Sequence, residues 1–179
     1  AFKNAKAENR KRLIHKIESA ANQYLSLLNV GDFTGTIRIF MTDHGNAESA
    51  LIDADGSRIE NPNTALRTTQ YMSILFAISR LSADRRERKY PLLFDAPTSS
   101  FTASKEAGFF NVIGELGNQV IIVTKSFLNE TTNAAGEKTD VIDMEKVRTL
   151  TGNIFRIEKK RPFDDNDLST IQTVITRIK

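Results

Sequence analysis

Apolar residues recur at helical spacing in the first part of the chain and then alternate with polar ones. Between residues 11 and 28 they lie three or four positions apart, which predicts an amphipathic helix. Residues 34–41 alternate, as expected of a strand with one buried face. Residues 49–59 predict a hairpin around Asp55-Gly56, a pair suited to the positive φ angles of a tight turn. The first sixty residues therefore predict a helix followed by a small antiparallel sheet.

From the polar loop at residues 60–63 onward, the apolar stretches become longer and more continuous. The elements predicted there are a helix at 71–81, a basic loop at 82–89, a strand at 91–94, a helix at 105–116 with Ser104 as N-cap, and a strand at 119–124. The positions of the first helix expected to be buried are Met72, Leu75, Phe76, Ser79 and Leu81. Both strands are apolar throughout, so we expect them to be buried on both faces. Strand, helix, strand with this pattern predicts an α/β fold, with a mostly parallel sheet flanked by helices.

The C-terminal third has a weaker pattern. Residues 126–140 are rich in Asn, Thr, Ala and Gly, which predicts a mobile loop or an insertion. The remaining elements predicted are a short helix at 141–150, a strand at 153–158, and a last helix that Asp167 caps and that presents Leu168, Ile171, Ile175 and Ile178. The whole chain, 1–179, is expected to form one domain, in which residues 1–29 are an incoming helix that continues upstream.

Composition excludes several functional classes. The chain of 179 residues has 40% apolar and 26% charged residues, which is typical of a globular domain. No apolar run approaches the roughly 20 residues that a membrane helix needs, and the N-terminus does not resemble a signal peptide. Cysteine is absent, and the two histidines lie far apart, so neither a disulfide framework nor a thiolate or histidine metal site is expected. These features favour a cytoplasmic protein, associated with the nucleoid if bacterial.

The net charge of +3 is unevenly distributed. Three cationic clusters stand out: Arg10, Lys11, Arg12 and Lys16; Arg85, Arg86, Arg88 and Lys89; and Lys159, Lys160 and Arg161. Such clusters bind nucleic acid by releasing the counterions of its phosphates. They are equally typical of a solvated surface, so charge alone leaves both interpretations open.

Candidate chemistry lies in an ordered series between residues 63 and 127. A polar segment opens a long apolar helix, a buried strand ends at Asp95, and a second buried strand ends in Thr124-Lys125. Ligands of open α/β sheets bind at the carboxyl ends of strands, where a carboxylate commonly holds magnesium against nucleotide phosphates. The start of a helix, with its free amides, also suits an anion. The series therefore predicts a phosphate site.

This series resembles the C-terminal lobe of the ABC ATPase head of SMC-like and double-strand-break-repair ATPases, in the P-loop NTPase superfamily. The resemblance covers most of the chain. It identifies residues 92–95 with the Walker B strand and 124–125 with the switch position. The signature motif would be Leu66, Arg67, Thr68, Thr69 and Gln70, and the D-loop would begin with Thr98, Ser99 and Ser100.

The resemblance implies a coiled coil upstream and a site shared between lobes. Asp95 would hold magnesium and Lys125 would lie near the γ-phosphate of ATP, so both are candidate catalytic residues. The sequence contains no G-x-x-x-x-G-K-[ST] motif, so an N-terminal lobe must supply the phosphate-binding loop. The signature motif would contact ATP bound by a second head, in a homodimer. The work implied is associated with DNA, as in repair, chromosome handling or defence against foreign DNA.

The sequence departs from the family pattern in three motifs. Ala96 stands where the family has a catalytic glutamate, and Lys125 stands where it has a histidine. In the signature, Arg67 replaces the usual serine and Thr68-Thr69 replace the glycines. Glu106 and Glu115 lie nearby in sequence, but both are expected to be solvated on the following helix, so neither is assigned as the base.

Several explanations of these departures stay open. The subfamily uses other residues, or the protein binds ATP without hydrolysing it, as a gated scaffold, or Ala96 is an engineered replacement. A basic DNA-binding module with no nucleotide dependence is the remaining alternative. Whether the protein is an ATP hydrolase is therefore left undecided by the sequence, although the series around Asp95 favours one.

Overall fold

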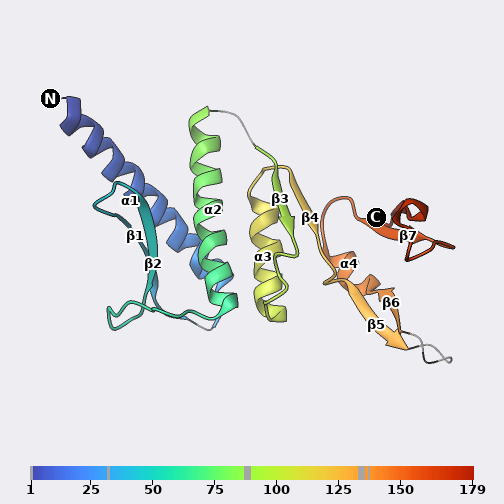
Figure 1. Ribbon diagram of the computed structural model, residues 1–179. Helices are drawn as coiled ribbons and strands as arrows, with labels where there is room; N and C mark the ends of the chain where they lie inside the picture. Colours follow the sequence, from blue (N-terminus) through green and yellow to red (C-terminus); the bar gives the residue numbers. More distant parts are fainter. Residues whose placement is uncertain (1, 32, 87–89, 133–135, 137) are drawn as a thin grey trace. The chain divides into compact units, whose positions relative to one another are not determined.

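The computed structural model describes residues 2–31, 33–86, 90–132, 136 and 138–179 (Figure 1). The chain divides into two compact units, Ala1–Ser126 and Phe127–Lys179, and each is described by itself below. The expectation of a single domain stays a prediction.

Among its described residues, the first unit combines three helices with two strand pairs. Its elements are α1 (Phe2–Leu28), β1 (Thr36–Met41), β2 (Ala47–Ile52), α2 (Thr64–Arg86), β3 (Leu92–Asp95), α3 (Ala103–Glu115) and β4 (Val120–Val123). β1 and β2 pair antiparallel, and β3 and β4 pair parallel. The mixed α/β composition agrees with the prediction from the sequence. The predicted mostly parallel sheet is not observed, because every strand pair other than β3–β4 among the described residues is antiparallel.

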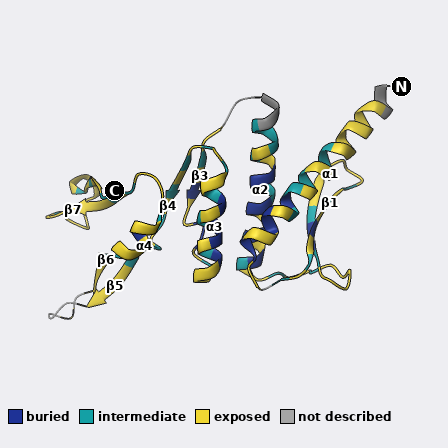
Figure 2. Ribbon diagram, turned by 180° about the vertical axis from the view of Figure 1, so that it is seen from behind, coloured by how far each residue is buried: buried dark blue, intermediate teal, exposed yellow. Residues whose placement is uncertain are grey.

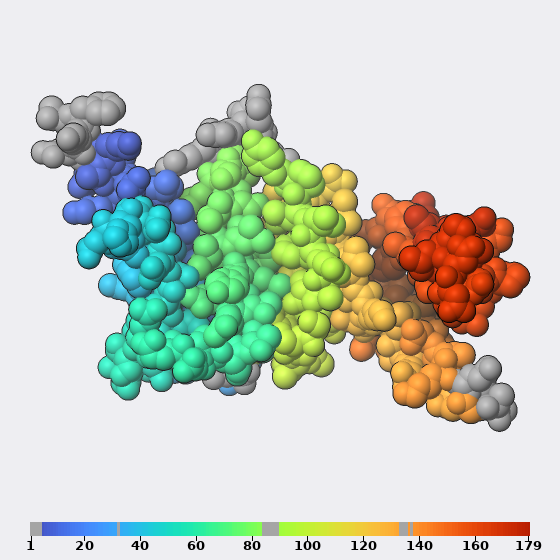
Figure 3. All heavy atoms as spheres, in the orientation of Figure 1, coloured from blue at the N-terminus to red at the C-terminus, as the bar shows by residue number. Residues whose placement is uncertain are grey.

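Phe76 of α2 lies at the centre of the core. It is 0% exposed, and its ring contacts Tyr24 of α1 at 5.7 Å, Phe94 of β3 at 6.0 Å and Phe109 of α3 at 6.2 Å between centroids. The space between the ribbons of α2 and α3 is therefore filled by side chains (Figure 3). Figure 2 shows the buried positions gathered in α2, in α3 and in the C-terminal half of α1. One aromatic cluster thus joins all three helices to the β3–β4 pair.

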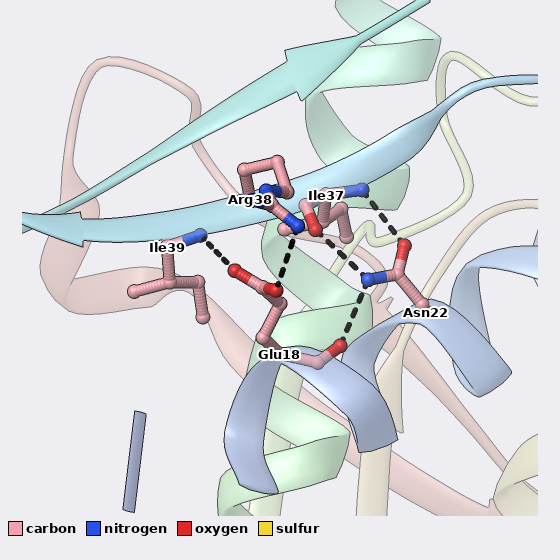
Figure 4. A network of polar contacts seen from close by, with 5 residues as sticks. All are labelled: Glu18, Asn22, Ile37, Arg38 and Ile39. Carbon is pink, nitrogen blue, oxygen red and sulfur yellow. Dashed lines mark hydrogen bonds and ion pairs between the residues drawn. The ribbon is translucent and has the colours of Figure 1, made fainter. Parts of the chain in front are cut away.

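Two side chains of α1 complete the hydrogen bonding of β1 on the edge that β2 leaves free (Figure 4). The Asn22 amide donates to the carbonyl of Ile37 at 2.8 Å and accepts from the Ile37 N–H at 2.7 Å. Glu18 accepts from the Ile39 N–H at 2.7 Å and forms an ion pair with Arg38 at 3.5 Å. An edge strand otherwise leaves backbone N–H and C=O groups unpaired. The side chains of α1 satisfy these groups of β1, as a neighbouring strand would.

Several boundaries in this unit differ from the sequence-based expectation. α2 runs from Thr64 to Arg86, so residues 82–86 of the predicted basic loop are helical, and residues 87–89 lie outside the described part. Leu75 was expected to be buried and is 40% exposed. The N-cap of α3 is Thr102 rather than Ser104. The turn at Asp55-Gly56 is confirmed, but the strand pairing runs mainly between β1 and β2.

The described part of the second unit contains two antiparallel strand pairs, a short α-helix and a 3-10 turn. Its elements are β5 (Leu128–Thr132), β6 (Lys138–Ile142), α4 (Met144–Thr149), β7 (Phe155–Lys160), the 3-10 turn η1 (Leu168–Thr170) and β8 (Gln172–Arg177). β5 pairs with β6, and β7 pairs with β8. The segment 126–140, expected as a loop, therefore carries β5 and part of β6, while residues 133–135 and 137 lie outside the described part.

The predicted last helix is wrong. Asp167 does act as a cap, since its carboxylate accepts from the Ser169 N–H at 3.0 Å, but it caps only the turn η1. The residues that follow form β8, which pairs with β7 from Lys160↔Gln172 to Phe155↔Arg177. The strand and the short helix predicted before it correspond to β7 and α4.

Candidate functional site

The carboxyl ends of β3 and β4 lie side by side. Asp95, the last residue of β3, is in register with Val123, the last of β4, and Thr124 and Lys125 follow directly. Because the pair is parallel, the polar residues after each strand gather at one edge. The side chains of Asp95 and Lys125 are exposed, and within the described residues no hydrogen bond or ion pair involves either one. A carboxylate and an ammonium group are thus available at this edge.

The turn after β3 begins at a backbone position unusual for alanine. Ala96 has a φ of 43°, in the left-handed region that favours glycine. Its N–H donates to the Val123 carbonyl at 2.7 Å, and its carbonyl accepts from the Ser99 N–H at 3.2 Å. These bonds hold the strained residue in place. Its methyl group is exposed, so no acid or base extends from this position.

Behind this turn lies a chain of side-chain hydrogen bonds from three elements. Thr98, which is 4% exposed, donates to the Glu106 carboxylate of α3 at 2.8 Å and lies 3.0 Å from the Ser126 hydroxyl. Thr124 donates to Ser126 at 2.9 Å and accepts from the Ser126 N–H at 3.1 Å. The expectation that Glu106 is solvated is wrong, since it is half-buried, whereas Glu115 is exposed as expected. Nothing in the sequence pattern indicates that Glu106 and Ser126 meet at Thr98.

The other two residues expected in the D-loop lie on the same turn. Ser99 is exposed and Ser100 is half-buried. Of these three residues, only Thr98 belongs to the hydrogen-bonded chain described above. Its hydroxyl is buried and hydrogen-bonded, whereas those of Ser99 and Ser100 are more accessible to solvent.

The five residues expected to contact nucleotide in trans lie in the first turns of α2. Asn63 caps this helix, because its side chain accepts from the Leu66 N–H at 2.8 Å. Leu66, Thr69 and Gln70 are buried, and the Gln70 amide donates to Ser49 of β2 at 3.1 Å. Arg67 is exposed and Thr68 is half-buried. Arg67 and Thr68 are therefore the members of the set with side chains available to a ligand.

One face of the β3–β4 pair is covered and the other is open. Phe94, on the inner face, is 8% exposed and packs in the aromatic core. On the outer face Leu93 is 73% exposed, Ile121 49% and Val123 50%. The expectation that both strands are buried on both faces is therefore wrong for this chain. Strands of this composition ordinarily have cover on each side.

Two of the three cationic clusters can be described. The side chains of Arg10, Lys11, Arg12 and Lys16 are exposed on α1, and a shallow hollow lined by Asn9, Arg10, Arg12, Leu13 and Lys16 lies along this helix. Lys159, Lys160 and Arg161 are also exposed, and two of them pack on the Phe163 ring. The cluster at 85–89 lies outside the side chains that the structure describes.

Asp95 provides a single carboxylate ligand rather than part of a larger set of protein ligands. Among the described residues, no group of three or more His, Asp or Glu side chains is placed to hold a metal ion. Magnesium fits such a site, because it is usually held by one or two carboxylates together with phosphate oxygens and water. The described helices include none with the length and hydropathy that crossing a bilayer requires.

Comparison with known proteins gives a structural match. No protein-family model matches the chain, and no curated protein matches it in sequence. The chain is similar to a crystal structure of an SMC head bound to the C-winged helix domain of ScpA, with a TM-score of 0.54 and 15% identity. The match covers 77% of this chain and 46% of the SMC head chain. At this identity the likeness shows the fold alone, which resembles that of an SMC head over somewhat less than half its length.

Proposed function

We propose that this chain is the C-terminal lobe of an SMC-like ATPase head, with its nucleotide site at the carboxyl edge of β3 and β4. The observation that carries the proposal is the edge itself, where the exposed Asp95 carboxylate ends β3 and the exposed Lys125 ammonium lies just after β4. Asp95 would hold magnesium, which would neutralise charge on the nucleotide phosphates. Lys125 would add a positive charge near the γ-phosphate.

The open face of the β3–β4 pair supports a second lobe that completes the site. Leu93, Ile121 and Val123 present apolar side chains there, and exposed apolar patches of this kind mark interaction surfaces. The matched SMC head is more than twice as long as the part this chain covers. An N-terminal lobe on this face would bring the phosphate-binding loop that the sequence lacks.

A second head would provide the trans contacts. Arg67 and Thr68, at the start of α2, have the side chains available for phosphate, and the free amides of a helix start favour an anion. ATP would shift the association equilibrium of two heads, because only the paired state contacts it from both sides.

Ala96 favours a second candidate, a head that binds ATP and pairs with little or no hydrolysis. Its methyl group cannot orient or deprotonate water, and loss of a general base typically lowers a rate by about 100- to 10,000-fold. This candidate uses the same site and differs only in turnover.

We also propose DNA as a partner, through the exposed cations of α1. Arg10, Arg12 and Lys16 line the hollow along that helix, and Arg12 forms an ion pair with Glu8 at 3.5 Å. A nucleotide-independent DNA-binding module would use these residues without Asp95.

The test is ATP binding and turnover by the full-length protein, with DNA, for the parent, Asp95→Asn and Ala96→Glu. Asp43→Asn, an exposed carboxylate in the turn between β1 and β2, is the matched control. The proposal predicts that Asp95→Asn loses magnesium-dependent turnover while Asp43→Asn keeps it. If the parent is inactive but pairs with ATP, and Ala96→Glu gains turnover, the scaffold candidate is correct.

DNA affinity separates the remaining alternative. Lys11→Ala with Lys16→Ala should weaken duplex binding and lower the slope of its salt dependence by about one for each phosphate that is no longer neutralised, whereas exposed Lys138→Ala should not. If the parent neither binds nor hydrolyses ATP, and DNA affinity is the same in Asp95→Asn, the protein is a nucleotide-independent DNA-binding module and the ATPase proposal is refuted.

A further inference from the structure

The hydroxyl groups behind Asp95 form a chain with a defined direction. Thr98 donates its proton to a carboxylate oxygen of Glu106, which accepts it. The hydroxyl of Thr98 has no second proton, so in its 3.0 Å contact with Ser126 the serine must donate. Ser126 in turn accepts from Thr124 at 2.9 Å. The protons therefore all point the same way, from Thr124 through Ser126 and Thr98 to Glu106.

This chain joins segments that are far apart in sequence. Thr98 belongs to the turn after β3, Thr124 and Ser126 to the segment after β4, and Glu106 to α3. Thr98 is 4% exposed, so water has little access to replace either of its partners. A chain of this kind is cooperative, because each polarised hydroxyl strengthens the next bond.

We propose that Glu106 is a positioning residue, whose carboxylate holds the turn after β3 and the segment after β4 in one fixed arrangement. Lys125 stands between two members of the chain, and the turn that carries Thr98 starts directly after Asp95. Glu106 thus orders both groups of the site without touching the reacting atoms. This role at a nucleotide site rests on the proposed function above, whereas the ordering of the two segments does not.

The hydrogen bonding of Glu106 argues against its serving as the general base that is absent at position 96. Its carboxylate is engaged by Thr98 and half-buried. A general base must lie within hydrogen-bond reach of the proton that it removes. Glu106 acts instead through Thr98, and its loss should disturb a backbone group that it never contacts, the Ser126 N–H bonded to Thr124.

The experiment measures amide hydrogen exchange and ATP kinetics on the full-length protein. The variants are Glu106→Ala, Thr98→Val, which removes the hydroxyl at nearly constant shape, and Thr98→Ser, which keeps it. Thr102→Val is the matched control, since Thr102 is exposed between the same turn and α3, makes no side-chain cap hydrogen bond, and its hydroxyl bonds with Ser104. Exchange of the Ile37 amide, in β1, serves as the reference away from this hydrogen-bonded chain.

We expect the Ser126 amide to exchange about tenfold faster in Glu106→Ala and Thr98→Val, the effect of losing roughly one hydrogen bond. The Ile37 amide should be unchanged, and Thr98→Ser should restore slow exchange. In an active protein, kcat should fall about tenfold in the two disrupting variants, with KM within about twofold, because a positioning defect acts on the reaction more than on binding.

Two results would overturn the proposal. One is unchanged Ser126 exchange in Glu106→Ala, since the carboxylate would then not order the segment after β4. The other is altered exchange in an active protein whose kcat matches that of Thr102→Val. If exchange responds as expected but the parent shows no ATP binding, the ordering by Glu106 stands and the proposed nucleotide site is what fails.

Discussion

Replacing Asn22 by alanine should uncouple α1 from β1. The Asn22 amide makes two hydrogen bonds with the backbone of Ile37, at 2.8 and 2.7 Å, and Ile37 is 0% exposed. Each bond contributes about 1 kcal/mol net, and a buried group left without a partner costs about 1–3 kcal/mol. We therefore expect Asn22→Ala to lower the free energy of unfolding by about 2–4 kcal/mol.

Asn22→Asp tests the hydrogen bond that Asn22 donates separately from the one that it accepts. An ionised carboxylate still accepts from the Ile37 N–H, but it cannot donate to the Ile37 carbonyl, which lies 2.8 Å from the present amide nitrogen. The variant should be about as unstable as Asn22→Ala at neutral pH, where the two oxygens repel. A protonated carboxyl group donates, so the deficit should shrink as pH falls towards about 3.9, the ordinary pKa of aspartate.

The assay is urea unfolding of this chain, followed by far-UV circular dichroism, with exchange of the Ile37 amide as the local measurement. Gln23→Ala is the control, because Gln23 is exposed on the next position of α1, and such changes usually fall within about 0.5 kcal/mol. A loss for Asn22→Ala no larger than that of Gln23→Ala would refute the reasoning. It would mean that water or Glu18 satisfies the edge of β1 instead.

Other substitutions test the core, the turn after β3 and the cap of α4. Phe76→Ala should cost about 3–5 kcal/mol in urea unfolding, because it removes the centre of the aromatic cluster, whereas Tyr71→Ala, 61% exposed on the same helix, should cost far less. Ala96→Gly should stabilise the chain by up to about 1 kcal/mol in the same assay, because glycine adopts a φ of 43° without strain. The hydrogen bond from the Lys146 N–H holds the pKa of Asp143 below its ordinary value. The stabilisation of α4 by Asp143 should therefore be fully present above the ordinary pKa of aspartate and be lost as pH falls through the lowered pKa. Amide exchange at Lys146 should accelerate over this pH range in the parent but not in Asp143→Asn.

Local patterns were sufficient to predict the elements of the first unit. The stripe of residues 11–28, the alternation of 34–41 and the apolar runs around Asp95 correspond to α1, β1, β3 and β4. Each signal depends on neighbours in sequence, whose spacing decides which residues share a face. The motifs on these elements also resemble those of SMC-like ATPase heads, and the structural comparison shows a similar fold.

The end of the chain shows where such reasoning fails. Leu168, Ile171, Ile175 and Ile178 are spaced as on a helix, yet residues 172–177 form β8. The β-branched residues in that segment suit a strand, and pairing with β7, more than ten residues away, selects it. Periodicity describes one segment at a time, whereas a strand is stabilised by its partner.

The hydrogen-bonded chain at Glu106 depends on the same kind of distant contact. The ends of the two apolar strands predicted Asp95 and Lys125 as members of a site, because strand ends are local features, whereas Thr98 was expected there only from the resemblance to ABC ATPase heads. Glu106 was expected on a solvated face, since a lone acid on a helix is most often exposed. Its contact with Thr98, and through Thr98 with Ser126, exists because β3, β4 and α3 pack together. A pattern along the sequence does not contain the distances between segments that come together only on folding.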